Sequence, residues 1–238
     1  MRHPTHIANS SRNHRQQKTS TLGTVGKRER ILKAAEQLFA QQGYANTTLE
    51  QIVSVLGVTK PYVYYYFHNK QEIFETLSWR PTVDCLTSMD FAPDDIRPAH
   101  VKVKEGIERL IRATIANYPA AFFPYREPQV YRPEYLIAQK KLANHFYERL
   151  CNLLEQGRRE GHFDFTETRI TAQAACSIPG FLYNWYRPDG RISPDAMAVE
   201  LSKLAWRVIG LREPDISKYD SLSAIKSTLQ PPINRRNI

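Results

Sequence analysis

Four tyrosines stand within five positions of one short stretch, VTKPYVYYYFHNK, which runs from Val58 to Lys70. A phenol offers a flat apolar ring that can lie against a thymine methyl or a sugar, and a hydroxyl that can donate to a phosphate oxygen. Lys60 and Lys70 flank the tyrosines and add positive charge. Together these residue types are suited to contact with a nucleic-acid duplex.

The stretch is expected to form a short helix. Thr59 can cap it, and Pro61 stands in its first turn, where proline costs little. At about 100° per residue, Val63 and Phe67 share one face of this helix. We expect that pair to pack inward on the preceding helices.

The other side chains of the helix should surround a protruding surface. Pro61, Tyr62 and Tyr65 lie roughly opposite the buried pair, and Tyr64 and Tyr66 flank it. The alternative is that some of these rings pack against the second half of the chain. We expect such packing for part of Tyr64 but not for the three opposite residues.

Two amphipathic helices should position this surface. The first begins near Gly26, ends at Gly43, and turns one apolar face inward: Ile31, Ala35, Leu38 and Phe39. The second opens with a capping box of Thr48 and Gln51, ends at Gly57, and buries Leu49, Ile52, Val53 and Leu56. Three helices, with a tight turn between the second and third, have helix-turn-helix spacing.

Positive charge is concentrated in the same part of the chain. The net charge is +9 over 238 residues, and residues 1–70 carry ten Lys and Arg against three acidic residues. Such asymmetry suggests an anionic partner, either a nucleic acid or an acidic membrane surface, although a solvated tail is the plain alternative. Residues 1–26 have no periodicity and are predicted to be a disordered basic arm, which follows a DNA groove or does nothing specific.

These motifs carry a resemblance. Over residues 27 to about 77, ILKAAEQLFAQQGYANTTLEQIVSVLGVTKPYVYYYFHNKQEIF resembles the DNA-binding domain of the TetR family of bacterial transcriptional repressors. Pro61 replaces the usual glycine of the recognition helix, and Tyr66 replaces a frequent histidine. The resemblance implies that Thr48, Tyr64 and Tyr66 contact phosphate and that Lys70 contacts the DNA backbone. It places five residues in the major groove: Thr59, Lys60, Pro61, Tyr62 and Tyr65.

The rest of the chain is predicted to be helical and broken by proline-rich turns. Helices are expected from about Val101 to Tyr118, in a long segment that ends at Gly157, and in two apolar segments near the C-terminus. Pro179 should kink the first apolar segment, and Ser193 should cap the second. The fold class is therefore all-α. The expected divisions are residues 27–70 for the helix-turn-helix domain, 71–212 for an effector-binding and dimerisation domain, and 213–238 for a polar tail.

The family resemblance also implies what the second domain does. The last two helices would pair with a second copy through Ile178, Leu182, Leu201, Leu204 and Val208, although both stripes could instead be intramolecular core. A small apolar effector would be enclosed by candidate residues that could equally be plain core: Trp79, Val83, Phe122, Phe123, Phe146, Phe181, Asn184 and Trp185. The segment LYNWYRPDGRISPDAMA is similar to regulators of fatty-acid, steroid and acyl-CoA metabolism. Arg126, Arg132 and Arg158 could meet an acidic group or be surface charges.

Other classes of protein are disfavoured. Cys85, Cys151 and Cys176 lie far apart, which argues against a disulfide framework or a zinc site and for a reducing compartment, so a cytoplasmic protein is expected. The seven histidines form no catalytic or metal-binding motif, no phosphate-cradling glycine loop occurs, and no cofactor or metal is expected. The sequence also lacks a secretory signal and a long apolar run.

We therefore expect no enzyme. The prediction is a repressor that binds a palindromic DNA operator as a homodimer and is released by a small apolar effector, such as a fatty acid, an acyl-CoA or a steroid. The rival is an architectural DNA-binding protein without an effector, which would not require so large an aromatic-rich second domain. Release from DNA by a ligand separates the two.

Overall fold

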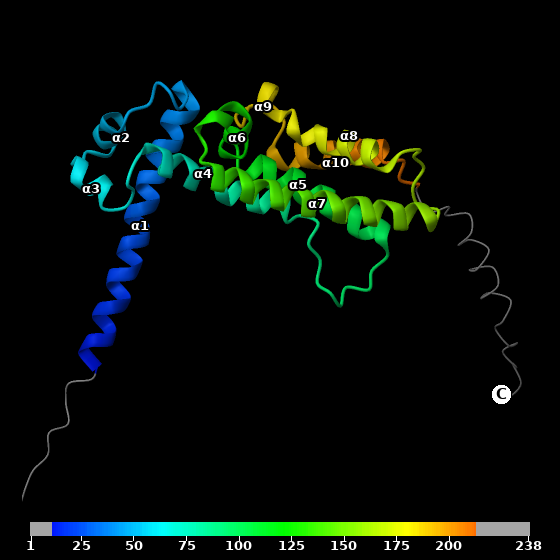
Figure 1. Ribbon diagram of the computed structural model, residues 1–238, viewed down its shortest axis with the longest axis horizontal. Helices are drawn as coiled ribbons and strands as arrows, with labels where there is room; N and C mark the ends of the chain where they lie inside the picture. Colours follow the sequence, from blue (N-terminus) through cyan, green and yellow to red (C-terminus); the bar gives the residue numbers. More distant parts are fainter. Residues whose placement is uncertain (1–10, 213–238) are drawn as a thin grey trace, which may run out of the picture.

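The computed structural model describes residues 11–212, with side chains from Gly26 onward, and every regular element in that range is a helix. Figure 1 shows a small N-terminal head joined to an elongated helical body. The head contains α1 (Ser11–Gln42), α2 (Leu49–Leu56), α3 (Lys60–Tyr64) and the start of α4 (Lys70–Leu86). The expected tail over residues 213–238 lies outside the described residues.

The head has its own core, which confirms the inward faces expected for its helices. Val63 and Phe67 are almost fully buried and pack with Ile31, Phe39 and Ile52. Gly57 ends α2 in the left-handed conformation (φ 64°), and its N–H bonds to carbonyls of the last turn. The sharp reversal that positions α3 therefore favours glycine at this position.

The N-terminal boundary differs from the expectation. An irregular arm is expected up to Gly26, but α1 continues back to Ser11 and projects from the head (Figure 1). Residues 11–25 show no apolar periodicity in the sequence, and extending an existing helix costs far less than nucleating one. Residues 1–10 lie outside the described part, and the division into domains stays a prediction.

The body is built from α4, α5 (Ala99–Ala116), α7 (Pro133–Arg159), α8 (Thr168–Gly180) and α10 (Pro194–Val208). Four short elements complete it: η1 (Ala120–Phe122), α6 (Phe123–Arg126), η2 (Pro128–Val130) and α9 (Leu182–Trp185). In Figure 1, α8 and α10 lie together along one side of α5 and α7. Pro179 stands near the end of α8, which stops at Gly180 rather than continuing with a kink.

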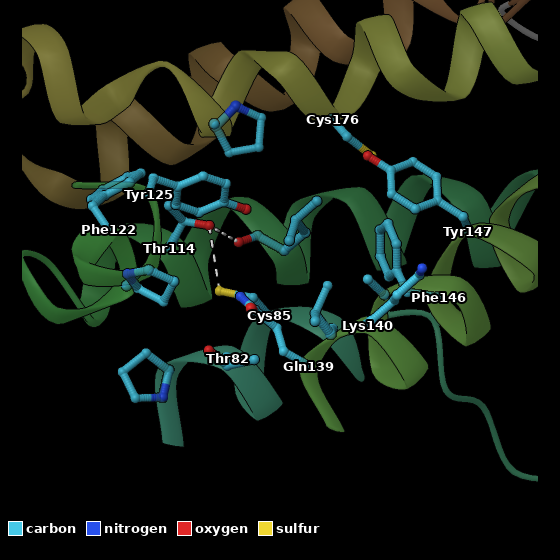
Figure 2. A pocket seen from close by; sticks show the side chains of 18 of the residues that line it. Thr82, Cys85, Thr114, Phe122, Tyr125, Gln139, Lys140, Phe146, Tyr147 and Cys176 are labelled. Atoms are coloured by element: carbon cyan, nitrogen blue, oxygen red, sulfur yellow. Dashed lines mark hydrogen bonds between the residues drawn. The ribbon is translucent and has the colours of Figure 1, made fainter. Parts of the chain in front are cut away.

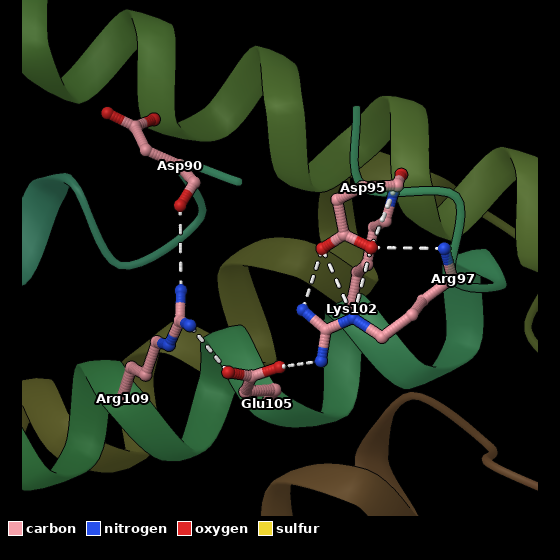
Figure 3. Close-up of polar contacts among 6 residues, drawn as sticks. All are labelled: Asp90, Asp95, Arg97, Lys102, Glu105 and Arg109. Atoms are coloured by element: carbon pink, nitrogen blue, oxygen red, sulfur yellow. Dashed lines mark hydrogen bonds and ion pairs between the residues drawn. The ribbon is translucent and has the colours of Figure 1, made fainter. Parts of the chain in front are cut away.

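A loop of residues 87–98 joins α4 to α5 and is held against α5 by charged side chains (Figure 3). Arg97 bonds to both Asp95 and Glu105, and Arg109 bonds to Glu105. The hydrogen bonds from Arg97 lower the pKa of Asp95 well below its usual range. No helix in the described range is both long and apolar enough to cross a membrane.

Candidate functional site

The tyrosine surface of α3 is only partly as expected. Tyr65 is 78% exposed and Tyr64 is 50% exposed. Tyr62, which is expected to point outward, is half-buried against the head core, and its ring meets Tyr66 edge-on at 5.6 Å. Tyr62 and Tyr66 are four positions apart and so lie on the same side of this segment, where both are half-buried.

Two threonines lie exposed beside this surface. The capping box at Thr48 is confirmed: its hydroxyl accepts from Gln51 N at 3.2 Å, and Gln51 Oε1 accepts from Thr48 N at 2.8 Å. Thr59 is at the N-cap of α3 as expected, but its side chain makes no capping hydrogen bond. The Thr59 hydroxyl is therefore available to a ligand, and the Thr48 hydroxyl, which accepts one bond, still has its O–H to donate.

The two flanking lysines are both engaged within the protein. Lys60 forms an exposed ion pair with Glu50 across the turn between α2 and α3. Lys70 donates to Tyr44 O at 2.7 Å and to Thr47 O at 2.6 Å, and it lies 4.0 Å from the centre of the Tyr44 ring. Partial burial lowers the pKa of Lys70. Lys70 thus holds the α1–α2 connection in place. Its ammonium group has one N–H left for the expected DNA contact, which stays a prediction.

A row of polar side chains fastens α4 to the chain segment 130–135. We call it the α4 seam. It pairs Gln71 with the carbonyl of Val130 (2.5 Å), Glu75 with Arg132 (2.7 Å), Ser78 with Tyr131 (2.6 Å) and Thr82 with Tyr135 (3.2 Å). These α4 residues recur at the spacing of one helix face. Aromatic packing continues the contact, because Phe74 of α4 stacks on Phe123 at 5.0 Å.

The α4 helix also forms one wall of a cavity in the body, of about 280 Å³ (Figure 2). The other walls come from α5, the η1–α6 segment, α7 and the end of α8. Most of the lining is apolar, and polar groups come from Thr114, Gln139 and Tyr147. Lys140 is the only charged residue among the described residues that line it. An apolar chamber with a few polar groups and one cation suits a small apolar molecule that carries an acidic group.

Two cysteines face this cavity. Cys85 of α4 lies 3.6 Å from the Thr114 hydroxyl, and Figure 2 shows Cys176 beside Tyr147 on the opposite side. Burial raises the pKa of Cys85 to about 11 and that of Cys176 to about 12. Both thiols are therefore protonated near neutral pH and act as apolar wall.

Only two of the candidate lining residues, Phe122 and Phe146, line the cavity. Phe123 belongs to the head-side core, and Val83 and Trp79 lie on α4 outside the cavity, where Trp79 packs edge-on to Tyr135. The remaining three candidates, Phe181, Asn184 and Trp185, are exposed. Most of the eight candidates are aromatic, whereas the cavity wall is set by which faces of α4 and α7 meet.

The residues that line the cavity from α7 and α4 follow a regular helical spacing in the sequence. The α7 residues of the cavity are Leu136, Gln139, Lys140, Ala143, Phe146 and Tyr147, which recur three and four positions apart. On α4 the same spacing joins Pro81, Thr82, Cys85 and Leu86. Neither set is strongly apolar, and Phe146 is the one residue of the two sets among the candidates chosen from the sequence. The arginines considered as anion partners lie elsewhere: Arg132 pairs with Glu75, Arg158 pairs with Glu155, and Arg126 donates to Tyr183 O.

Some of the residues expected to pair with a second copy are buried in the body, and others are exposed. Leu182 and Leu201 belong to the core of the body, and Ile178 is half-buried. Leu204 and Val208 are exposed, and so are Ile170, Phe181, Trp185 and Val199. On α8 the exposed side carries Ile170 and Ala174, because Ala172, Ala175 and Pro179 cover the core instead.

Models of known protein families match both the head and the body of this chain. A family model described as "Bacterial regulatory proteins, tetR family" matches residues 31–77, and one described as "Tetracyclin repressor-like, C-terminal domain" matches residues 97–209. The first therefore covers the α1–α4 head, and the second covers α5 to α10.

Among curated relatives, the regulator TtgR of Pseudomonas putida is 37% identical over 73 residues, 30% of this chain and 35% of TtgR. The chain thus spans about a third of the length of the first curated relatives it matches. The repressor KstR2 of Rhodococcus jostii is 25% identical over 75% of this chain and 88% of its own.

Two solved structures share the fold. AibR in complex with isovaleryl coenzyme A and operator DNA has a TM-score of 0.63 at 16% identity, over 78% of this chain and 100% of AibR. The ketosteroid transcriptional regulator KstR2 of Mycobacterium tuberculosis has a TM-score of 0.65 at 18% identity, over 78% of this chain and 95% of KstR2. The matched head and body together show that the chain belongs to the tetR family of bacterial transcriptional regulators, and that it is a regulator rather than an enzyme.

Proposed function

We propose that this chain is a ligand-responsive repressor, which binds a palindromic operator as a homodimer and is released by a small apolar effector bearing an acidic group. The observation that carries the proposal is the double role of α4. Its first turns, with Ile73 and Phe74, are buried in the core of the DNA-binding head. Its last turns, with Thr82 and Cys85, form a wall of the cavity.

The exposed rings of α3 supply the DNA contact in this proposal. Tyr65 and Pro61 are exposed, and Tyr64 and the Thr59 hydroxyl stand beside them. Lys60 would exchange its exposed ion pair with Glu50 for a phosphate or a base edge, at small cost because such pairs are weak in water. Tyr62 and Tyr66 would support the exposed rings from below, with their hydroxyls directed to phosphate.

A dimer follows from the geometry of the duplex. One α3 reads one half-site, and two copies must present their helices about 34–36 Å apart to read two half-sites one turn apart. We propose that the exposed apolar residues of α8 and α10, Leu204 and Val208 among them, pair with the same residues of a second copy. Every change in the tilt of α4 would then alter the separation of the two α3 helices.

The effector class is inferred from the cavity. Its volume of about 280 Å³ lies just below the roughly 300–1,000 Å³ common for small-molecule sites, so it suits an acyl chain or a compact ring system. Lys140 on α7 would pair with a carboxylate or with a phosphate of an acyl-CoA whose larger head group stays outside. Two structural relatives support this class: AibR, solved with isovaleryl coenzyme A and operator DNA, and KstR2, described as a ketosteroid transcriptional regulator.

The test is operator binding in the presence of candidate effectors. In vitro selection from a random duplex library would supply the operator, and fluorescence anisotropy would then follow its affinity across fatty acids, acyl-CoAs, steroids and aromatic acids. A ligand can release DNA only if it binds the released form more tightly. An effector that binds by calorimetry yet leaves the anisotropy midpoint in place contradicts the α4 mechanism. A panel in which none of the compounds binds favours the architectural alternative.

Two adjacent lysines provide a matched control for the acidic group. Lys140 lines the cavity and Lys141 does not, although both are exposed residues of α7. Lys140→Ala should weaken binding of an acidic effector about fivefold, as expected for loss of an ion pair of ~1 kcal/mol, and Lys141→Ala should leave it unchanged. Equal effects of the two substitutions would show that the acidic group does not meet Lys140.

A further inference from the structure

Three side chains with metal-ligating atoms meet at the end of the body that lies farthest from the head. His100 is in the first turn of α5, Glu160 follows the last residue of α7, and His162 stands two positions later. One ligand atom from each lies within 4.8 Å of the other two. The sequence spacing predicts no metal site, since about sixty residues separate His100 from the other two.

The turn after α7 brings these groups together. Gly161 has φ 81°, which lets His162 N donate back to Gly157 O at 2.8 Å and closes the helix end. The carbonyl of His162 accepts from Arg212 N at 3.0 Å, which fixes the segment against the end of α10. Gln156 donates to Glu160 Oε1 at 2.9 Å and so orients the carboxylate, leaving its second oxygen for another partner.

The histidine pair is unusual for a purely structural contact. The two rings lie 3.7 Å apart between centroids at 39°, and His100 Nδ1 is buried without a hydrogen-bond partner among the described residues. A buried nitrogen of this kind costs free energy unless some group bonds to it.

We propose that His100, Glu160 and His162 bind one divalent transition-metal ion, with zinc as the best fit. Two imidazoles and one carboxylate are the ligands of many open zinc sites, in which water takes the fourth position, whereas calcium and magnesium prefer oxygen ligands alone. Zinc bonds of about 2.0–2.1 Å place tetrahedral ligand atoms roughly 3.3–3.5 Å apart. The three atoms need to close by no more than about 1.5 Å, which rotation of the exposed Glu160 side chain and small ring movements can supply.

The experiment uses the full chain after treatment with a chelator. His3, His6 and His14 are replaced by glutamine in every protein, so that no imidazole at the N-terminus competes. Zinc is titrated in competition with a chromophoric chelator, and cobalt is used as a spectroscopic probe. We expect one equivalent per chain and cobalt absorption of the intensity given by four-coordinate sites.

Glu160→Gln and His162→Gln should each lower zinc affinity more than about tenfold, because loss of even an outer-shell partner costs about 10–100-fold. His145→Gln is the matched control, since His145 is an exposed histidine of α7 outside the cluster. Zinc should also raise the unfolding midpoint of the parent chain and leave unchanged that of the double variant, which carries both Glu160→Gln and His162→Gln. The proposal is overturned if no stoichiometric zinc binding occurs, or if the double variant, folded by circular dichroism, binds zinc as the parent does.

Discussion

Glu75 is the residue whose replacement tests the α4 seam most directly. Its side chain is 5% exposed, which for a carboxylate requires good partners. Glu75 Oε1 accepts from the backbone N–H of Arg132 at 2.7 Å, and Oε2 accepts from the guanidinium Nε at 2.7 Å. Glu75→Gln keeps the shape of the side chain but turns one of the two acceptors into a donor that faces another donor.

The expected loss of stability follows from those two bonds. A hydrogen bond to a charged group contributes about 1.5–3 kcal/mol, and the substitution removes one such bond and weakens the other. The Arg132 guanidinium is largely exposed and can bond to water instead. The free energy lost with its bond to Glu75 is therefore at the low end of that range. We expect the free energy of unfolding to fall by about 2 kcal/mol.

Urea denaturation followed by circular dichroism measures this change, provided that the slope with denaturant stays the same. Glu134→Gln is the matched control, because Glu134 is an exposed carboxylate two residues from Arg132, and it should change stability by less than about 0.5 kcal/mol. Glu75→Gln should also reduce the effector-induced change in operator affinity, since the seam joins α4 to the cavity wall. A variant of parental stability and parental response would refute the view that these bonds hold α4 in register.

The remaining predictions concern the head, the pairing face and the cavity. Tyr65→Ala should weaken operator binding by about 1–3 kcal/mol in a gel-shift titration, whereas Val63→Asp should unfold the head and lower the helical signal. Operator affinity should fall steeply with salt, and removal of residues 1–26 should flatten the log–log slope if that segment touches phosphate. Leu204→Glu should convert dimers to monomers in sedimentation velocity without loss of helicity, because the side chain is already 47% exposed in one chain. At pH 8, Cys85 should be alkylated at least about a hundredfold more slowly than in the unfolded chain, judged by peptide mass spectrometry, because burial raises its pKa to about 11 from the usual ~8.5.

The head could be predicted from the sequence because its determinants are local. The capping box of Thr48 and Gln51 lies within four positions, and Gly57 permits the left-handed turn by itself. The inward pair Val63 and Phe67 follows from helical periodicity, and the structure buries both. Such features depend on hydrogen bonds and dihedral angles within one or two turns, so they hold whatever the rest of the chain does.

The tertiary structure decided everything that joins distant segments. Lys70 meets carbonyls more than twenty positions earlier, and Glu75 meets Arg132 far later in the chain, so neither partner can be read from spacing. The same holds for the cavity wall and for the meeting of His100 with His162. A helix such as α8 has two faces of similar apolar content, and only the way α5, α7 and α10 cross it determines which one is buried. Packing geometry, rather than composition, therefore selects the residues that meet a ligand, a partner or a metal.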